Sequence, residues 1–212
     1  MPDKYFQLVL TPAVQHAQDQ YFGKHQIAED APEADALTPD EAAFIAARDS
    51  FYLATVSEIG WPYIQHRGGP PGFLKVLGPH LIGFADFKGN RQLVSTGNLG
   101  GSDRVALFLM DYPQRTRLKL LGRARVLDAG EHPELANQLA PEPLRRKVER
   151  LFLIQVIAYD WNCPQYITPR FTAAEVETQT APLKARIAEL EARLGGRDTR
   201  ARRDGIQDSN DA

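Results

Sequence analysis

Short runs of apolar residues separated by polar turns dominate the middle of the chain and predict β-strands. The clearest run, residues 51–56, combines aromatic and β-branched side chains, and residues 58–60 turn the chain back into a second strand at 61–67. Further strands are predicted at 73–77, 80–85, 104–110, 117–127 and 151–159. Short strands with tight hairpins and few intervening helices favour an antiparallel barrel over a doubly wound parallel sheet.

Helix signals flank and interrupt these strands. Thr11, followed by proline, is placed to cap a helix that Gly23 ends. Thr38 and Glu41 form a capping box, in which each side chain satisfies the other residue's backbone N–H. The segment 29–37 between these helices is acidic and rich in alanine and proline, which predicts an exposed linker. The predicted helices are 12–23, 39–48, a short one opening at 90–91, one within 131–150 and one at 173–194.

The C-terminal helix carries one apolar stripe. Leu183, Ile187, Leu190 and Leu194 recur at intervals of four, three and four, while charged residues occupy the other faces. Such a stripe is expected to pack either on the chain's own barrel or on a partner subunit, and the pattern leaves both open. The polar tail is expected to be disordered. The predicted organisation is 1–37 helix and linker, 38–171 barrel, 172–194 helix and 195–212 tail.

Composition narrows the class of protein. The chain has 212 residues, 43% of them hydrophobic and 25% charged, enough for one substantial core. Its net charge of -2 argues against nucleic-acid and membrane-surface partners. The single cysteine, Cys163, permits no internal disulfide or Cys-pair metal site and reads as a small hydrophobe rather than a nucleophile. Without a signal-like N-terminus or a long apolar run, we expect a cytoplasmic protein.

Glycines and cations gather between the strands of residues 67–91. Arg67 offers a planar fork for a phosphate, Lys75 and Lys88 offer point charges, and Asn90-Arg91 would open a helix whose N–H groups favour an anion. This surface suits a ligand with a phosphate and a flat ring. The alternative is that these are ordinary turn glycines and solvated cations.

The order of these features resembles the pyridoxamine 5'-phosphate oxidase-like flavoproteins. The shared features are the capped helix, the hairpin 51–67, a lysine on the next strand, the segment 86–91 opening a helix, and the strands containing 104–108 and 117–124. The resemblance covers about residues 38–171. It implies a mainly β, α+β fold: an antiparallel split β-barrel that binds FMN at a homodimer interface.

The same resemblance assigns roles to particular residues. It implies FMN contacts at Arg67, Lys75, Asp86, Lys88, Asn90, Arg91, Arg117, Trp161 and Arg170. Arg67 and Lys75 would lie along strands facing the cofactor, whereas the cations of 88–91 would hold the phosphate. Arg117 stands where the oxidases have a glutamine touching the ring, so it would stabilise reduced flavin unless it is a solvated strand residue. No catalytic residue and no metal ligand is indicated.

A C-terminal motif separates this chain from the vitamin B6 enzymes. The oxidases carry W-x-G-G-P-x-R-L-H-D-R-F, and this chain has W-N-C-P-Q-Y-I-T-P-R-F. Aligned from Arg170, the motif keeps Trp161 and Arg170 as flavin contacts. The segment from Gln165 onward would face the substrate, but Tyr166 and Thr168 replace the arginine and histidine that grip it. Without those donors a phosphorylated vitamer would be held poorly.

These features predict an FMN-dependent oxidoreductase that acts on an unidentified small molecule or electron donor. The alternative is a non-catalytic FMN carrier, stress protein or sensor. A haem-handling relative is a third reading, but it needs an axial ligand. The five histidines are isolated in the sequence, and only His66, beside Arg67, stands out.

Overall fold

The computed structural model describes residues 3–89, 91–140, 142–162 and 164–207, with no account of the side chains of residues 3, 143, 162 and 195–207. The predictions for Asn90 and Cys163 therefore lie outside the described residues, as does the tail beyond 207. The chain forms two compact units, which divide after Thr168. Each unit is described by itself.

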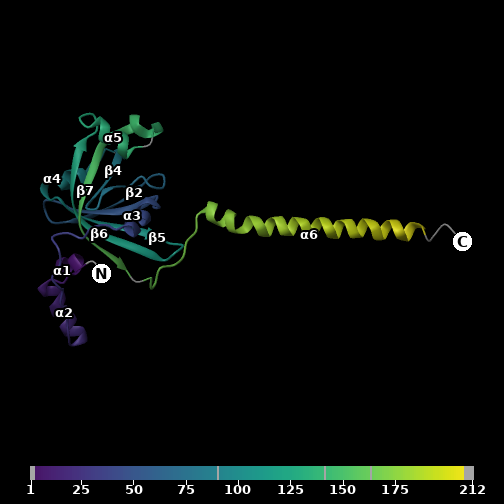
Figure 1. Ribbon diagram of the computed structural model, residues 1–212, viewed down its shortest axis with the longest axis horizontal. Coiled ribbons are helices and arrows are strands. Elements are labelled where there is room, and N and C mark those ends of the chain that lie inside the picture. The colour runs from purple at the N-terminus through teal and green to yellow at the C-terminus, as the bar shows by residue number, and fades with distance from the viewer. Residues whose placement is uncertain (1–2, 90, 141, 163, 208–212) are drawn as a thin grey trace. The chain divides into compact units, whose positions relative to one another are not determined.

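The first unit is built on one antiparallel sheet of seven strands in the order β2-β1-β5-β6-β7-β4-β3 (Figure 1). The strands are β1 Ser50–Val56, β2 Pro62–Gly68, β3 Lys75–Gly78, β4 Leu81–Phe87, β5 Arg104–Asp111, β6 Thr116–Asp128 and β7 Val148–Asn162. Every paired neighbour is antiparallel. The predicted α+β class and antiparallel split barrel are confirmed, and each predicted strand is present.

The helices are α1 Asp3–Val9, α2 Pro12–Phe22, α3 Pro39–Ala46, α4 Val94–Gly101, α5 Pro133–Leu139 and α6 Ala173–Gln207, with a 3-10 turn, η1, at Glu142–Lys147. The predicted caps are confirmed. Thr11 caps α2, and Gly23 ends it with a left-handed φ of 71°. The capping box of α3 forms, with Glu41 Oε2 accepting from the Thr38 N–H at 2.9 Å.

Most of residues 29–37 are exposed, as their composition predicts, but the C-terminal end of this segment is partly buried. Asp35 and Leu37 are buried. The Asp35 N–H donates to the Ile157 carbonyl at 2.9 Å, and the Leu37 N–H donates to the Pro79 carbonyl at 2.7 Å. The partners are far away in the sequence, so no local pattern could show that this segment lies against the barrel.

The helix predicted to open at 90–91 begins later, at Val94. Arg91 and Leu93 have φ values of 63° and 53°, in the left-handed region. A right-handed helix cannot include residues in this conformation, so α4 starts only after Leu93. The backbone of 91–93 instead forms a tight, strained entry to the helix.

The C-terminal helix extends beyond its predicted end at 194. It is one continuous helix to Gln207 (Figure 1), so the part of the expected disordered tail from 195 to 207 is helical. Gly195 and Gly196 each cost about 1 kcal/mol relative to alanine in a helix, but Ala201 and the four arginines that follow favour continuation. None of the described helices is long and apolar enough to cross a membrane.

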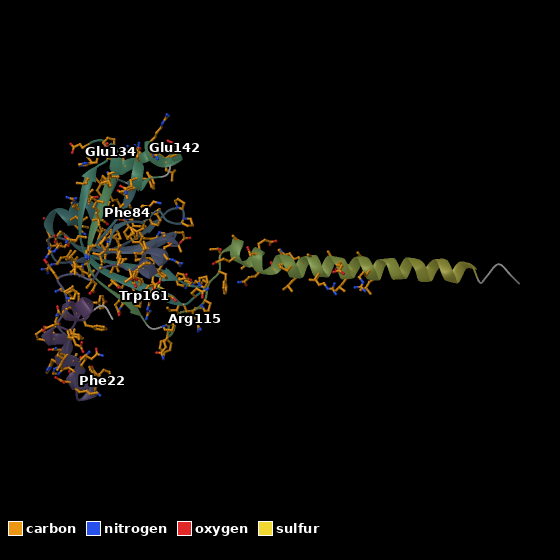
Figure 2. All side chains as sticks on the ribbon, in the orientation of Figure 1. Phe22, Phe84, Arg115, Glu134, Glu142 and Trp161 are labelled. Carbon is orange, nitrogen blue, oxygen red and sulfur yellow. The ribbon has the colours of Figure 1, made fainter. Side chains whose placement is uncertain are left out.

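Alternate residues of the strands fill the barrel. On β1 the side chains of Phe51, Leu53 and Thr55 are buried. The Phe51 ring centre lies 5.4 Å from that of Phe84, which is labelled in Figure 2. Phe84 stacks on Phe152 with 4.8 Å between the ring centres. These aromatic contacts join β1 to β4 and β7 in the core of the barrel.

Candidate functional site

A pocket of about 250 Å³, here called the arginine pocket, opens where β2, β4 and the start of α4 meet. Phe87, Gly89, Leu93 and Val94 contribute to its wall. Its polar lining comprises Gln65, Arg67, Asp86, Arg91, Ser95, Thr96 and Arg150.

Asp86 ties two of these arginines together. Its Oδ1 lies 2.6 Å from Arg67 Nη1, and its Oδ2 lies 2.9 Å from Arg150 Nε. Asp86 and Arg150 are directly opposite each other in the register of β4 and β7. Arg67 comes from β2, at the other end of the sheet order, so this ion pair closes the barrel as well as shaping the pocket.

The Arg67 guanidinium is held in place by aromatic rings as well. Its central carbon lies 5.6 Å from the ring centre of Phe84 and 5.1 Å from that of Phe152. Its Nε is buried, with no hydrogen-bond partner within the described part of the chain. The ion pair with Asp86 therefore leaves hydrogen-bonding capacity on this guanidinium, which fits an anionic ligand.

Helix α4 is fixed against the barrel by side-chain hydrogen bonds. Buried Ser95 donates from Oγ to Gln65 Oε1 at 3.1 Å, and Asn98 donates from Nδ2 to Thr55 Oγ1 at 2.9 Å. These bonds aim the N-terminal turn of α4 at the pocket. The unpaired N–H groups and the positive dipole end of a helix favour an anion at this position.

The charge and size of the arginine pocket fit a phosphate monoester. Among the residues that line the pocket, Arg67, Arg91 and Arg150 against Asp86 leave two formal positive charges, although Arg150 also pairs with Glu149, outside the lining, at 3.0 Å. A phosphate monoester carries about -1.5 to -2 at pH 7, which matches this excess. Pockets for entire drug-sized ligands occupy about 300–1,000 Å³. At about 250 Å³ the pocket is large enough for a phosphate end, but a flat ring system would extend beyond it.

The structure brings together three of the predicted cofactor residues, Arg67, Asp86 and Arg91. Lys75 and Lys88 do not line the pocket. The Lys88 side chain is exposed, and its backbone N–H donates to the Lys147 carbonyl at 3.0 Å.

Arg117 and Trp161 lie elsewhere in the barrel. Arg117 sits on β6 with its guanidinium carbon 6.0 Å from the ring centre of Phe108. Trp161 (Figure 2) donates from Nε1 to buried Glu41 Oε1 at 2.6 Å and packs edge-on against Phe44. The Trp161 indole N–H therefore serves a buried network, and its flavin contact stays a prediction.

Glu41 has an altered acidity in this network. Burial alone would raise its pKa, but hydrogen bonds from Thr38 and Trp161 stabilise the carboxylate and together lower the pKa below the ordinary value. Burial and the neighbouring Glu41 carboxylate raise the pKa of Tyr159 to about 12. The network is thus ionised at Glu41 and neutral at Tyr159 near pH 7.

The predicted substrate segment is a surface loop. Gln165, Tyr166 and Thr168 are exposed, and none of them lines the arginine pocket. Tyr166 is fully exposed with a left-handed φ of 61°, while buried Ile167 anchors the loop. Arg170 is exposed and belongs to the second unit.

Sequence reasoning missed four polar residues of the pocket. Gln65 could have been predicted from the sequence, because residues two apart on a strand share a face and Arg67 was already a candidate. Ser95 and Thr96 follow from the true start of α4 at Val94. Arg150 gave no local signal, because its role depends on pairing with Asp86 across β4 and β7.

A second, apolar groove of about 510 Å³ lies on the outside of β1, β2, β5 and β6. Its lining includes Tyr52, Ile64 and Phe108. Ile64 is 65% exposed and Tyr52 40% exposed, although both lie on well-ordered strands. An apolar sheet face of this kind typically marks an interaction surface.

A family model for pyridoxamine 5'-phosphate oxidase matches residues 37–156, more than half of the chain. The chain belongs to this family. The matched region of this oxidase-family chain contains all strands of the barrel up to the middle of β7 and every polar residue of the arginine pocket. No curated protein matches the sequence significantly.

Solved structures to which the chain is similar include a putative pyridoxamine 5'-phosphate oxidase from Lactobacillus delbrueckii. The sequence identity is 19%, the match covers 59% of this chain and 93% of that chain, and the TM-score is 0.46. An FMN-binding protein from Syntrophomonas wolfei gives 13% identity, 57% and 81% coverage and a TM-score of 0.44. The haem storage protein HutZ from Vibrio cholerae is 16% identical, and the match covers 57% of this chain and 90% of that chain with a TM-score of 0.37. Likenesses this distant do not bear on the function of this member of the oxidase family.

Proposed function

We propose that this protein is an FMN-binding flavoprotein, and that it is an oxidoreductase acting on a small molecule. The observation that carries the proposal is the arginine pocket. Its two formal positive charges, its buried guanidinium donors and the N-terminus of α4 together suit the phosphate of FMN. Membership of the oxidase family supports the same cofactor.

The side chains of the pocket supply binding and orientation. Arg67, Arg91 and Arg150 would neutralise the phosphate, while Asp86 keeps two of them in position. Among the described pocket residues only Asp86 has an ordinary carboxyl group able to accept a proton, and it is committed to two arginines. The chemistry supplied by bound FMN would be hydride or electron transfer, with no proton carrier from this pocket.

A homodimer would complete the site. The pocket in one protomer is too small for a whole FMN, so the ring needs further walls. The apolar groove on β1, β2, β5 and β6 offers a surface for a second copy. A partner bound there would cover Ile64 and Tyr52 and would place additional side chains near the cofactor.

A non-catalytic FMN carrier is the second candidate. The absence of an uncommitted acid or base among the described pocket residues favours it, since a carrier needs only binding. Stopped-flow absorbance separates the two candidates. Reduction of bound FMN by NADPH or NADH, followed by reoxidation with an acceptor, supports the oxidoreductase, whereas flavin that resists every reductant offered supports the carrier.

The protein is not expected to oxidise pyridoxine or pyridoxamine 5'-phosphate. Tyr166 and Thr168 replace an arginine and a histidine, and each lost charged donor costs about 1.5–3 kcal/mol. The specificity constant should therefore fall roughly a hundredfold or more. An oxygen-consumption assay on FMN-loaded protein tests this with both vitamers, and turnover comparable to a B6 oxidase would overturn the expectation.

The phosphate assignment is tested by comparing FMN with riboflavin, which lacks the phosphate. We expect FMN to bind more tightly by fluorescence titration. Arg91→Ala should weaken FMN binding by about 1.5–3 kcal/mol, the cost of a charge-assisted contact, and leave riboflavin binding unchanged. Lys88→Ala is the matched control, because this exposed cation is near in sequence but does not line the pocket. Equal affinity for FMN and riboflavin would contradict the assignment.

A further inference from the structure

The C-terminal helix α6 carries a continuous stripe of apolar residues along one face. Its large members are 41–64% exposed. The stripe consists of Val176, Thr180, Leu183, Ile187, Leu190 and Leu194. These positions alternate by four and three residues, which is the a/d repeat of a coiled coil rather than the broader face of a helix that packs on a globular core.

The residue types within the stripe favour a pair of parallel helices. With Leu183 and Leu190 at d and Ile187 at a, the central part has the combination preferred by parallel two-stranded coiled coils. Thr180 is the one polar member of the stripe. Its Oγ1 donates to the Val176 carbonyl at 2.9 Å, so the hydroxyl would not be left unsatisfied in the seam.

The charges beside the stripe fit a second copy of the same helix. Arg186 falls at g and Glu191 at e, five residues later, and these positions meet between the two chains of a parallel pair. Symmetry would form this ion pair twice. In an antiparallel pair the g positions of the two chains face each other. Arg186 and Arg193, both at g, would then repel each other across the pair, and this repulsion would cancel any attraction between residues at the e positions.

Glu191 has no evident role within its own helix. Its neighbours three and four residues away are Ile187, Ala188, Leu194 and Gly195, none of which is charged. Arg186, by contrast, already pairs with Glu189 in the same helix. A partner helix would give Glu191 a cation without requiring any change of the backbone.

We infer that α6 pairs with the α6 of a second copy as a parallel, in-register, two-stranded coiled coil. The seam from Val176 to Leu194 spans 19 residues, about 27 Å at 1.5 Å per residue. The pairing of two helices along so short a seam becomes more stable if another contact already holds the two chains together, because tethering raises the effective concentration of the helices. The pairing adds an interface separate from the FMN site and does not require the protein to bind FMN.

Disulfide trapping in the full-length chain tests the inference. In a Cys163→Ser background, Leu190→Cys places the only thiol at a d position, where the two chains of a parallel pair lie within disulfide reach. Ala188→Cys, two residues away at the outward b position, is the matched control. We expect the first variant to form a disulfide-linked dimer at least about tenfold faster under mild oxidation. Leu183→Cys against Ala185→Cys repeats the comparison one heptad earlier.

Charge exchange separates helix pairing from other contacts. Added to Leu190→Cys, Arg186→Glu should slow trapping by roughly tenfold, since two attractive pairs become repulsive. Further addition of Glu191→Arg should restore the rate, although it cannot restore the ion pair of Arg186 with Glu189 within the helix. Equal trapping at the d and outward positions, or no restoration by the double exchange, would overturn the inference in favour of packing on the barrel or another partner.

Discussion

Asp86 is the residue that most directly holds the arginine pocket together. Its carboxylate pairs with both Arg67 and Arg150, whose side chains are only 13% and 19% exposed. Arginine side chains this little exposed are costly to leave without a counter-ion. The strength of this ion pair and the affinity of the pocket for anions should therefore be linked, because a bound phosphate could take over part of the role of the carboxylate.

Asp86→Asn should lower the free energy of unfolding by about 3 kcal/mol, because it leaves the largely buried Arg67 without its counter-ion, whereas Arg150 keeps its ion pair with Glu149. FMN or inorganic phosphate should then raise the melting temperature of the variant more than that of the wild type. Asp103→Asn is the control, since its ion pair with Arg123 is about half exposed and should contribute less than about 1 kcal/mol. An Asp86→Asn protein as stable as Asp103→Asn would contradict this account.

Glu41 predicts a pH dependence of stability. Its pKa is lowered in the folded state, so its contribution is fully present above the pKa of the unfolded chain, about 4.3. The contribution is lost as the pH falls through the lower pKa of the folded state. Glu41→Gln should cost about 1–3 kcal/mol at pH 7 and should flatten the stability profile below about pH 4.3.

Urea denaturation at a series of pH values from 7 to 3 measures this effect. Glu142→Gln serves as the control, because that carboxylate is 79% exposed. If Glu41→Gln and the wild type lose stability in parallel as the pH falls, Glu41 is not the group responsible.

At the scale of elements, the pairing of β6 with β7 depends on Gly122, where the register shifts. A Cβ at this position would lie 2.6 Å from the Gln155 carbonyl oxygen and 2.8 Å from Ile154 Cγ2. Gly122→Ala should therefore destabilise the protein by about 1–3 kcal/mol through overpacking. Gly100→Ala in α4 meets nothing within 4 Å and should be neutral or stabilising by thermal denaturation. Equal melting temperatures for the two variants would show that the strands can move apart at the bulge.

At the scale of the whole molecule, the proposed dimer and the proposed FMN binding should be linked. Ile64→Glu places a charge in the apolar groove, so we expect a shift towards monomer in sedimentation equilibrium and a loss of FMN affinity. Ile27→Glu is the control, because Ile27 is 79% exposed, more than Ile64, but does not line the groove. A monomer that binds FMN as tightly as the wild type would show that one protomer is sufficient.

Local chemistry in the sequence determined the elements and part of the site. The capping box of Thr38 and Glu41, the strand pattern from 51 onward and the cations at Arg67 and Arg91 all act within a few residues, so they could be interpreted without the fold. The order of these local features also sufficed for the family, which the match over residues 37–156 confirms.

Tertiary structure decided what those local signals could not. Arg150 enters the pocket only because β4 and β7 pair in one register, and Arg67 meets Asp86 only because the barrel brings β2 to β4. Trp161 is turned towards Glu41 by the same closure. Periodicity and capping report interactions between near neighbours, whereas an ion pair across a closed sheet depends on contacts between residues distant in sequence. For this reason the sequence determined that cations gather between residues 67 and 91, while only the fold decided which arginines line the pocket.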